Sequence, residues 1–162
     1  MRRKLTVLVA GIAAVAAVTT TALAVVPGET PFPSPTVVTL FVTTNTVTAP
    51  SSALGDGVLS NFYPRGSSVV FRVFAADATS GKVLTAADVK YAYVKIPNQP
   101  NVKLTYTAPT TRNGPNFTGT WTVPAGYPTG LVNFTTRFQS TKKKYGNFVQ
   151  LPVASSQLTV TT

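Results

Sequence analysis

The chain has 162 residues, with 14 lysines and arginines against four acidic residues and a net charge of +10. It contains no histidine and no cysteine, which removes the usual catalytic bases, thiolates and most transition-metal ligands and excludes a small disulfide-linked scaffold. Basicity of this size favours anionic partners such as acidic glycans, lipid head groups or acidic proteins.

Residues 1–24 have the pattern of a signal peptide. A basic start, Arg2-Arg3-Lys4, precedes an apolar stretch, and Ala22-Leu23-Ala24 supplies the small-x-small pattern that a signal peptidase reads. Cleavage there would leave one domain-sized chain with a charge of +7 and no transmembrane span. The alternative is an uncleaved anchor, because no charge interrupts the sequence from Leu5 to Gly28. Both readings predict export to the periplasm, the cell surface or the medium.

Residues 25–35 (VVPGETPFPSP) form a proline-rich leader. Prolines at this density disfavour helix and regular strand, and favour an extended, semi-rigid spacer. The domain is expected to occupy residues 36–162.

Strands and turns alternate through the first half of this domain. Residues 36–44 (TVVTLFVTT) are β-branched and apolar and predict a first strand. A long loop follows over 51–65, with glycine and proline turn signals. Residues 67–76 (SSVVFRVFAA) are apolar on both faces, which is typical of a strand near the centre of a sheet. Residues 89–96 (VKYAYVKI) alternate with period two.

The second half continues in the same way. Val102, Leu104 and Tyr106 share one face of a further strand. The next strand places four residues on one face, namely Phe117, Gly119, Trp121 and Val123. Residues 131–140 alternate with their buried side at Val132, Phe134, Thr136 and Phe138. A hairpin tip at 142–147 leads into a terminal strand over 148–160, interrupted by Pro152. At most one helical turn is expected, at 75–78 or 85–88. About seven strands in one domain predict an all-β, antiparallel β-sandwich.

Four motifs carry a resemblance to a known class. They are "NFYPRGSSVVFRV", "GKVLTAADVKYAYVKIPNQP", "WTVPAGYPTG" and "YGNFVQLPVASSQLTV". Over residues 36–162 the chain resembles bacterial exported immunoglobulin-like domains, in which a Gly-Ser start to the second strand and a W-x-V-P corner recur. The resemblance implies an immunoglobulin-like β-sandwich and a non-enzymatic adhesion, spacer or accessory role. The chain lacks the Cys…Trp…Cys framework of antibody domains.

Trp121 is the only tryptophan. It shares its face with Phe117 and Val123, so we expect it to hold the core together. A platform for a sugar ligand is the alternative, although such a site usually presents several aromatic side chains.

The first candidate binding surface is a stripe of Tyr91, Tyr93 and Lys95. Ala92, Val94 and Ile96 occupy the other face and form the expected core side, which leaves Lys90 awkwardly placed. A tyrosine–lysine stripe can stack on a glycan ring or cover a partner protein. The alternative is that both tyrosines pack under a neighbouring loop.

The second candidate is Lys142-Lys143-Lys144, followed by Tyr145, at the hairpin tip. Three lysines there would attract an anionic glycan or lipid surface in a salt-dependent manner. The alternative is an ordinary solvated turn.

No catalytic, cofactor-binding or metal-binding residue is predicted. The aspartates are isolated and lack calcium-loop spacing. The sequence therefore predicts a non-catalytic exported module that contacts another extracytoplasmic or cell-envelope protein, through a sheet face or by strand addition at the terminal strand. The alternative is a carbohydrate- or anionic-surface-binding module. Export argues against nucleic acid, and no cofactor is expected.

Overall fold

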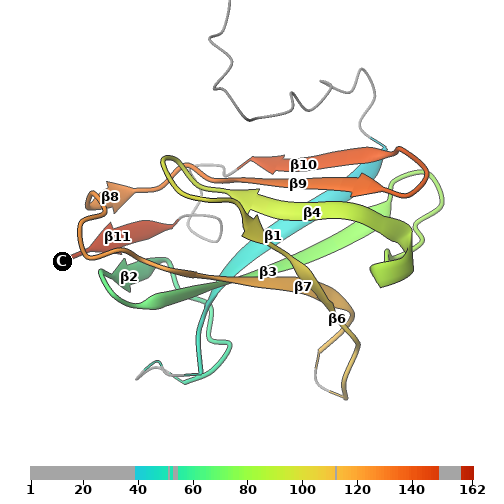
Figure 1. Ribbon diagram of the computed structural model, residues 1–162. Helices are drawn as coiled ribbons and strands as arrows, with labels where there is room; N and C mark the ends of the chain where they lie inside the picture. Colours follow the sequence, from blue (N-terminus) through green and yellow to red (C-terminus); the bar gives the residue numbers. More distant parts are fainter. Residues whose placement is uncertain (1–38, 51, 53–54, 112, 150–157) are drawn as a thin grey trace, which may run out of the picture. The chain divides into compact units, whose positions relative to one another are not determined.

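Eleven strands and a single 3-10 turn make up the domain in the computed structural model, which describes residues 39–50, 52, 55–111, 113–149 and 158–162 (Figure 1). The strands are β1 Leu40–Thr48, β2 Phe62–Pro64, β3 Ser68–Asp77, β4 Val89–Lys95, β5 Val102–Lys103, β6 Thr105–Thr107, β7 Asn116–Thr122, β8 Gly130–Leu131, β9 Thr135–Ser140, β10 Tyr145–Val149 and β11 Thr159–Thr161. The turn, η1, spans Ala86–Asp88. The expected signal peptide, the leader and the break at Pro152 lie outside the described residues.

The strands form three sheets, which we name the β3 sheet (order β1-β3-β7-β6), the β4 sheet (β10-β9-β4-β5) and the small sheet (β2-β11-β8). Every pairing is antiparallel except that of β2 with β11. The all-β, antiparallel prediction is therefore confirmed, and the sheets are consistent with a β-sandwich. The turn at η1 agrees with the helical turn expected at 85–88, whereas residues 75–77 belong to β3.

The inward faces of the two large sheets supply the core. Phe71 of β3 packs edge-to-face against Phe134 with ring centroids 5.2 Å apart, and Phe117 of β7 packs in the same way against Phe138 of β9 at 5.0 Å. The predicted inward faces of the segments 117–123 and 131–140 are confirmed. Their buried side chains are Phe117, Trp121, Val123, Val132, Phe134, Thr136 and Phe138. Trp121 is therefore a core residue, as expected.

Several strands differ from the sequence-based boundaries. The first strand begins at Leu40 and continues to Thr48. The strand expected across Leu104 is divided, because β5 pairs with β4 while β6 pairs with β7. The chain thus changes sheets at Leu104. Such divisions explain why the structure has more and shorter strands than the seven expected.

The two described parts of the expected terminal strand differ in whether their edges are paired. The expected strand over 148–160 is divided between β10 and β11. β11 lies in the middle of the small sheet, with β2 on one side and β8 on the other. Both edges of β11 are therefore paired, whereas β10 is the edge strand of the β4 sheet, so strand addition at the terminal strand stays a prediction for β10.

Candidate functional site

The outward face of the β4 sheet brings together most of the predicted binding residues. We call it the tyrosine face. Its cross-strand rows are Tyr91, Gln139 and Tyr145; then Lys103, Tyr93, Arg137 and Asn147; then Lys95, Thr135 and Val149. Three tyrosines from two strands, two lysines and an arginine therefore share one surface, and no member of these rows is acidic.

Tyr91, Tyr93 and Lys95 lie on this face as their alternation predicts. Tyr91 has 51% of its surface exposed, and Tyr93 and Lys95 are half-buried. Tyr145 of β10 joins the row of Tyr91 through Gln139, whose Nε2 donates to the Tyr145 hydroxyl at 3.0 Å. This hydrogen bond holds two neighbouring side chains of the face in a fixed relation.

The hairpin lysines do not act as one cluster. Lys142 and Lys143 are exposed, and Lys143 has a left-handed backbone with φ of 59°. Lys144 instead turns to Asp77 at the end of β3 and forms an ion pair with its carboxylate. This hydrogen bond, with those from the Ser80 and Thr79 amides, lowers the Asp77 pKa to about 2. Lys144 is therefore paired with Asp77, whereas Lys142 and Lys143 are the exposed lysines of the tip.

Lys90 is turned out of the core by a β-bulge. The register of β4 against β9 pairs Val89 with Ser140 and Tyr91 with Gln139, so Lys90 is the extra residue. A bulge re-aims the inserted side chain, and Lys90 is accordingly exposed, with its Nζ 5.2 Å from the centroid of the Tyr91 ring. The awkward inward position that strict alternation assigns to Lys90 does not occur.

A hollow of about 430 Å³ opens beside this bulge. We call it the bulge hollow; its charged and aromatic lining is Lys90, Tyr91, Tyr93, Lys103, Tyr106 and Phe117. Ala92 and Leu104 add apolar surface. It lies where β5 leaves β4 and the chain passes into the β3 sheet, and it is continuous with the tyrosine face through Tyr91, Tyr93 and Lys103.

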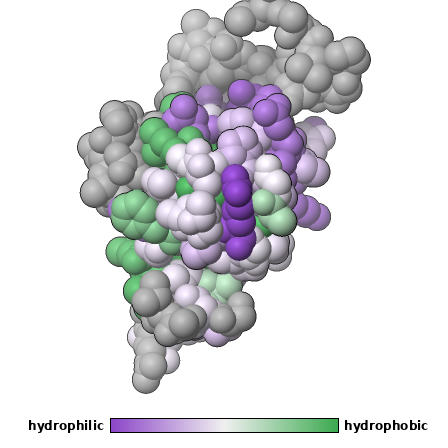
Figure 2. Space-filling view, turned by 90° about the vertical axis from the view of Figure 1, so that its left-hand side faces the viewer, coloured by the Kyte–Doolittle hydropathy of each residue, from purple (hydrophilic) through white to green (hydrophobic). Residues whose placement is uncertain are grey.

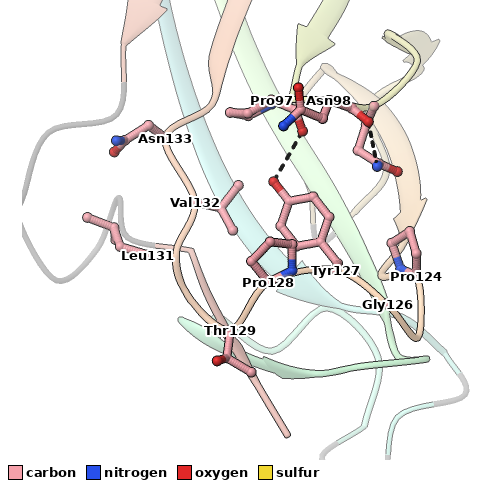
Figure 3. Close-up of a pocket in the computed structure, with 11 residues that line it drawn as sticks. Pro97, Asn98, Pro124, Gly126, Tyr127, Pro128, Thr129, Leu131, Val132 and Asn133 are labelled. Carbon is pink, nitrogen blue, oxygen red and sulfur yellow. Dashed lines mark hydrogen bonds between the residues drawn. The ribbon is translucent and has the colours of Figure 1, made fainter.

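A second hollow, of about 480 Å³, lies among the loops near the small sheet (Figure 3). Its lining includes Pro97, Pro124, Tyr127 and Pro128, and no lining side chain is charged. The Tyr127 hydroxyl points to the Pro97 carbonyl and donates to it at 3.3 Å (Figure 3). That hydroxyl ties two loops together, and the described lining of this hollow has no cation to bind an acidic ligand, unlike that of the bulge hollow.

The small sheet carries exposed apolar side chains. Phe62 of β2 and Leu131 of β8 are both in register with Thr159 of β11, one on each side, and are 65% and 53% exposed. Figure 2 views this end of the domain, where apolar surface gathers toward the left and hydrophilic surface toward the upper right. We call Phe62 and Leu131 the apolar pair.

Two of the acidic side chains, Asp77 and Asp88, are engaged in structural contacts. Asp88 accepts from the Thr85 amide and hydroxyl and from Lys82 Nζ at 2.8 Å, and these contacts lower its pKa to about 2, the Lys82 bond contributing most. Over the described ranges, no group of three or more His, Cys, Asp or Glu side chains could hold a metal ion. Across the same ranges, no helix is long and apolar enough to cross a membrane.

Sequence reasoning missed Lys90, Lys103, Tyr106, Arg137, Gln139 and Asn147. The signal for Arg137 and Gln139 was present, because both alternate with the buried Thr136 and Phe138. Their place beside Tyr91 and Tyr93 depends on strand pairing between distant segments, which no local pattern reveals.

Comparisons with known proteins provide no identification: no family model, curated protein or solved structure matches the chain.

Proposed function

We propose that this protein is a non-catalytic, exported binding module of immunoglobulin-like topology, which holds an acidic polysaccharide on its tyrosine face. The strand orders β1-β3-β7-β6 and β10-β9-β4 support the topology. Taken in chain order they correspond to the ABED and GFC sheets of an immunoglobulin-like sandwich.

The observation that carries the binding proposal is the composition of the tyrosine face. Tyr91, Tyr93 and Tyr145 lie among Lys95, Lys103 and Arg137 without a carboxylate in the same rows. The negative π-face of a tyrosine attracts the partly positive C–H bonds of a sugar ring. The surrounding cations attract acidic groups on the same polymer, and attraction of this kind weakens with salt.

The hydrogen-bonding groups fit the same ligand. Gln139 lies between Tyr91 and Tyr145, and Asn147 lies beside Arg137. Their amides can both donate to and accept from sugar hydroxyls. A lipid surface would have less use for such groups than for apolar side chains that insert into the bilayer. The face therefore favours a hydroxyl-rich, acidic polymer.

The test is binding of an acidic polysaccharide, such as polygalacturonate, to the purified chain and to Tyr91→Ser/Tyr93→Ser. The double variant should lose at least tenfold in affinity with an unchanged circular dichroism spectrum. Phe41→Ser is the matched control, since Phe41 is a 57% exposed aromatic residue on β1 of the other large sheet. Equal binding by the double variant and the wild type would contradict the proposal.

Contact with another cell-envelope protein is the second candidate function. It is favoured by the apolar pair, because Phe62 and Leu131 are large, exposed and separated only by Thr159. Apolar contacts persist at high salt, whereas glycan binding to the tyrosine face should not. Capture of a discrete protein at high salt by the wild type, but not by Phe62→Ser/Leu131→Ser, would support this function.

A further inference from the structure

We infer that the bulge hollow is the anchoring subsite for a carboxylate-bearing sugar unit. Lys90 and Lys103 bind the acidic group, and Tyr106 forms a wall of the hollow against which the sugar ring packs. The inference rests on the proposed function and deepens it: the tyrosine face would hold the neighbouring units of the polymer, and the bulge hollow would select an acidic one.

The hollow exists because the chain changes sheets. β5 pairs Lys103 with Tyr93, and a continued antiparallel register would place Thr105 opposite Tyr91 and Tyr106 opposite Lys90. Instead, the Leu104 amide makes a last bond to the Ala92 carbonyl, at 3.0 Å, and β6 pairs with β7. Among the described strands, none pairs with the first half of β4 on this side. The resulting space lies between the two large sheets at their lateral edge.

The aromatic wall of this hollow is fixed by the core. The Tyr106 ring packs edge-to-face on Phe117 at 5.3 Å, and Phe117 packs on the fully buried Phe138 at 5.0 Å. A wall that is held in place before the ligand arrives loses little conformational entropy on binding. Tyr106 is thus anchored by its contacts, which suits it to bound a rigid ring.

The charges of the hollow fit a single acidic group. Lys90 and Lys103 line the hollow, and no acidic residue is found among the described residues that line it. Asp88, two residues before Lys90, is already bound by Lys82 and Thr85. The Tyr91 ring lies 5.2 Å from Lys90 Nζ and restrains it near the hollow. The positive charge there is therefore not neutralised within the lining.

The form of the hollow favours a carboxylate attached directly to a sugar ring. Its volume of about 430 Å³ is within the range of roughly 300–1,000 Å³ typical of small-molecule sites. The lysines and the apolar floor of Ala92 and Leu104 belong to the same space. Charge and ring must therefore come from one unit, as in a uronic acid. In a phosphodiester-linked polymer the charge sits between units instead.

The experiment compares a short oligogalacturonate with its methyl ester, which keeps the ring and removes the charge. Isothermal titration calorimetry on the purified chain should give roughly tenfold tighter binding of the acid, the factor that corresponds to about 1.4 kcal/mol. In Lys90→Gln/Lys103→Gln, most of this preference should be lost, and the remainder should be that due to Lys95 and Arg137 of the tyrosine face. Lys142→Gln/Lys143→Gln makes the same change in net charge at the hairpin tip and should retain the preference.

Three results would overturn the inference. One is an unchanged preference for the acid in Lys90→Gln/Lys103→Gln. Another is an equal loss in both double variants, which would mean that only net charge matters. The third is tighter binding of a polyglutamate peptide than of the oligogalacturonate, which would assign the hollow to acidic protein.

A second readout separates this inference from the proposed function. Galacturonic acid alone, titrated into the isotopically labelled chain, should shift the NMR signals of Lys103 and Tyr106. Such shifts, with polygalacturonate binding that is insensitive to Tyr145→Ser/Asn147→Ala, two residues of the tyrosine face that do not line the hollow, would keep the bulge hollow and reject the tyrosine face. Binding that depends on Tyr145 and Asn147, with an acid preference that Lys90→Gln/Lys103→Gln leaves unchanged, would keep the face and reject the hollow.

Discussion

Thr44 of β1 and Thr136 of β9 join the two large sheets through their hydroxyl groups, whose Oγ1 atoms lie 2.8 Å apart in the core. Both residues are almost completely buried, at 1% and 0% exposure. A buried hydroxyl without a partner is costly, whereas two that bond each other are satisfied. The pair therefore fixes how β1 lies against β9.

Removing one member of this pair should destabilise the domain more than removing both. Thr44→Val leaves the Thr136 hydroxyl buried and unpaired, which costs about 1–3 kcal/mol. Thr44→Val/Thr136→Val replaces both groups by apolar ones of the same shape and should recover most of that loss. Urea unfolding of the wild type, both single variants and the double variant measures the coupling. Strictly additive single effects would show that the hydroxyls do not interact.

Gly146 of β10 is required by close packing against β1. A Cβ at this position would lie 2.7 Å from Leu40 Cβ and 2.8 Å from the Leu40 carbonyl oxygen, neither of which can rotate away. Gly146→Ala should therefore destabilise the domain by about 1–3 kcal/mol. Gly126→Ala is the matched control, because nothing lies within 4 Å of its Cβ position. A thermal unfolding midpoint for Gly146→Ala equal to that of Gly126→Ala would contradict the packing argument.

Trp121 ties β7 to the loops at one end of the domain. Its ring packs edge-to-face on Tyr127 at 5.0 Å, and its Nε1 donates to Gln99 Oε1 at 3.4 Å. Trp121→Ala should cost about 3–5 kcal/mol, and Trp121→Phe should cost less because it keeps the apolar contact. Tryptophan fluorescence is lost in both, so circular dichroism under urea is the measurement. A Trp121→Ala protein as stable as the wild type would refute the core role.

Local alternation predicts which residues of a strand are buried, and here it does so well. Phe117 and Trp121 of one strand, and Phe134 and Phe138 of another region, are buried as their spacing requires. Period two follows from strand geometry alone and needs no knowledge of neighbours. It therefore holds wherever the strand is regular.

The same reasoning fails where the strand is irregular or the partner is distant. Strict alternation predicts that the Lys90 side chain points into the core, but a one-residue bulge turns it outward. The division at Leu104 depends on competition between β4 and β7 for the same segment. Lys144 and Asp77, which form an ion pair, are 67 residues apart in the chain. None of these three features leaves a local pattern in the sequence.

Acid should destabilise the domain only at low pH. Both Asp77 and Asp88 have pKa values lowered from 3.8 to about 2, chiefly by their lysine partners. Their contribution to stability is fully present above pH 3.8, where the carboxyl groups of the unfolded chain are ionised. It is lost as the pH falls from 3.8 toward 2. No histidine is present to titrate near neutrality.

The urea midpoint should therefore stay level through the neutral range and fall steeply below a pH of about 4. Asp77→Asn should be less stable than the wild type at neutral pH and should show a shallower fall in acid. Lys144→Gln should act in the same direction, since it removes the largest cause of the lowered Asp77 pKa. A midpoint that falls equally steeply in the wild type and in Asp77→Asn would exclude Asp77 as a source of the acid sensitivity.

Substitutions of the three hairpin lysines should have different effects on the stability of the domain. Lys143 has φ of 59°, a left-handed conformation that costs a residue with a Cβ roughly 1–2 kcal/mol and costs glycine little. Lys143→Gly should therefore stabilise the domain by up to about 1 kcal/mol, because the greater freedom of glycine in the unfolded chain offsets the rest of the relieved strain.

Lys144→Ala should destabilise the domain, because Asp77 loses its partner. Lys142→Ala, at an exposed position, is the control and should stay within about 0.5 kcal/mol of the wild type. Urea unfolding at neutral pH ranks the three variants, and a loss of stability in Lys143→Gly would show that the Lys143 side chain makes a stabilising contact that outweighs the backbone strain.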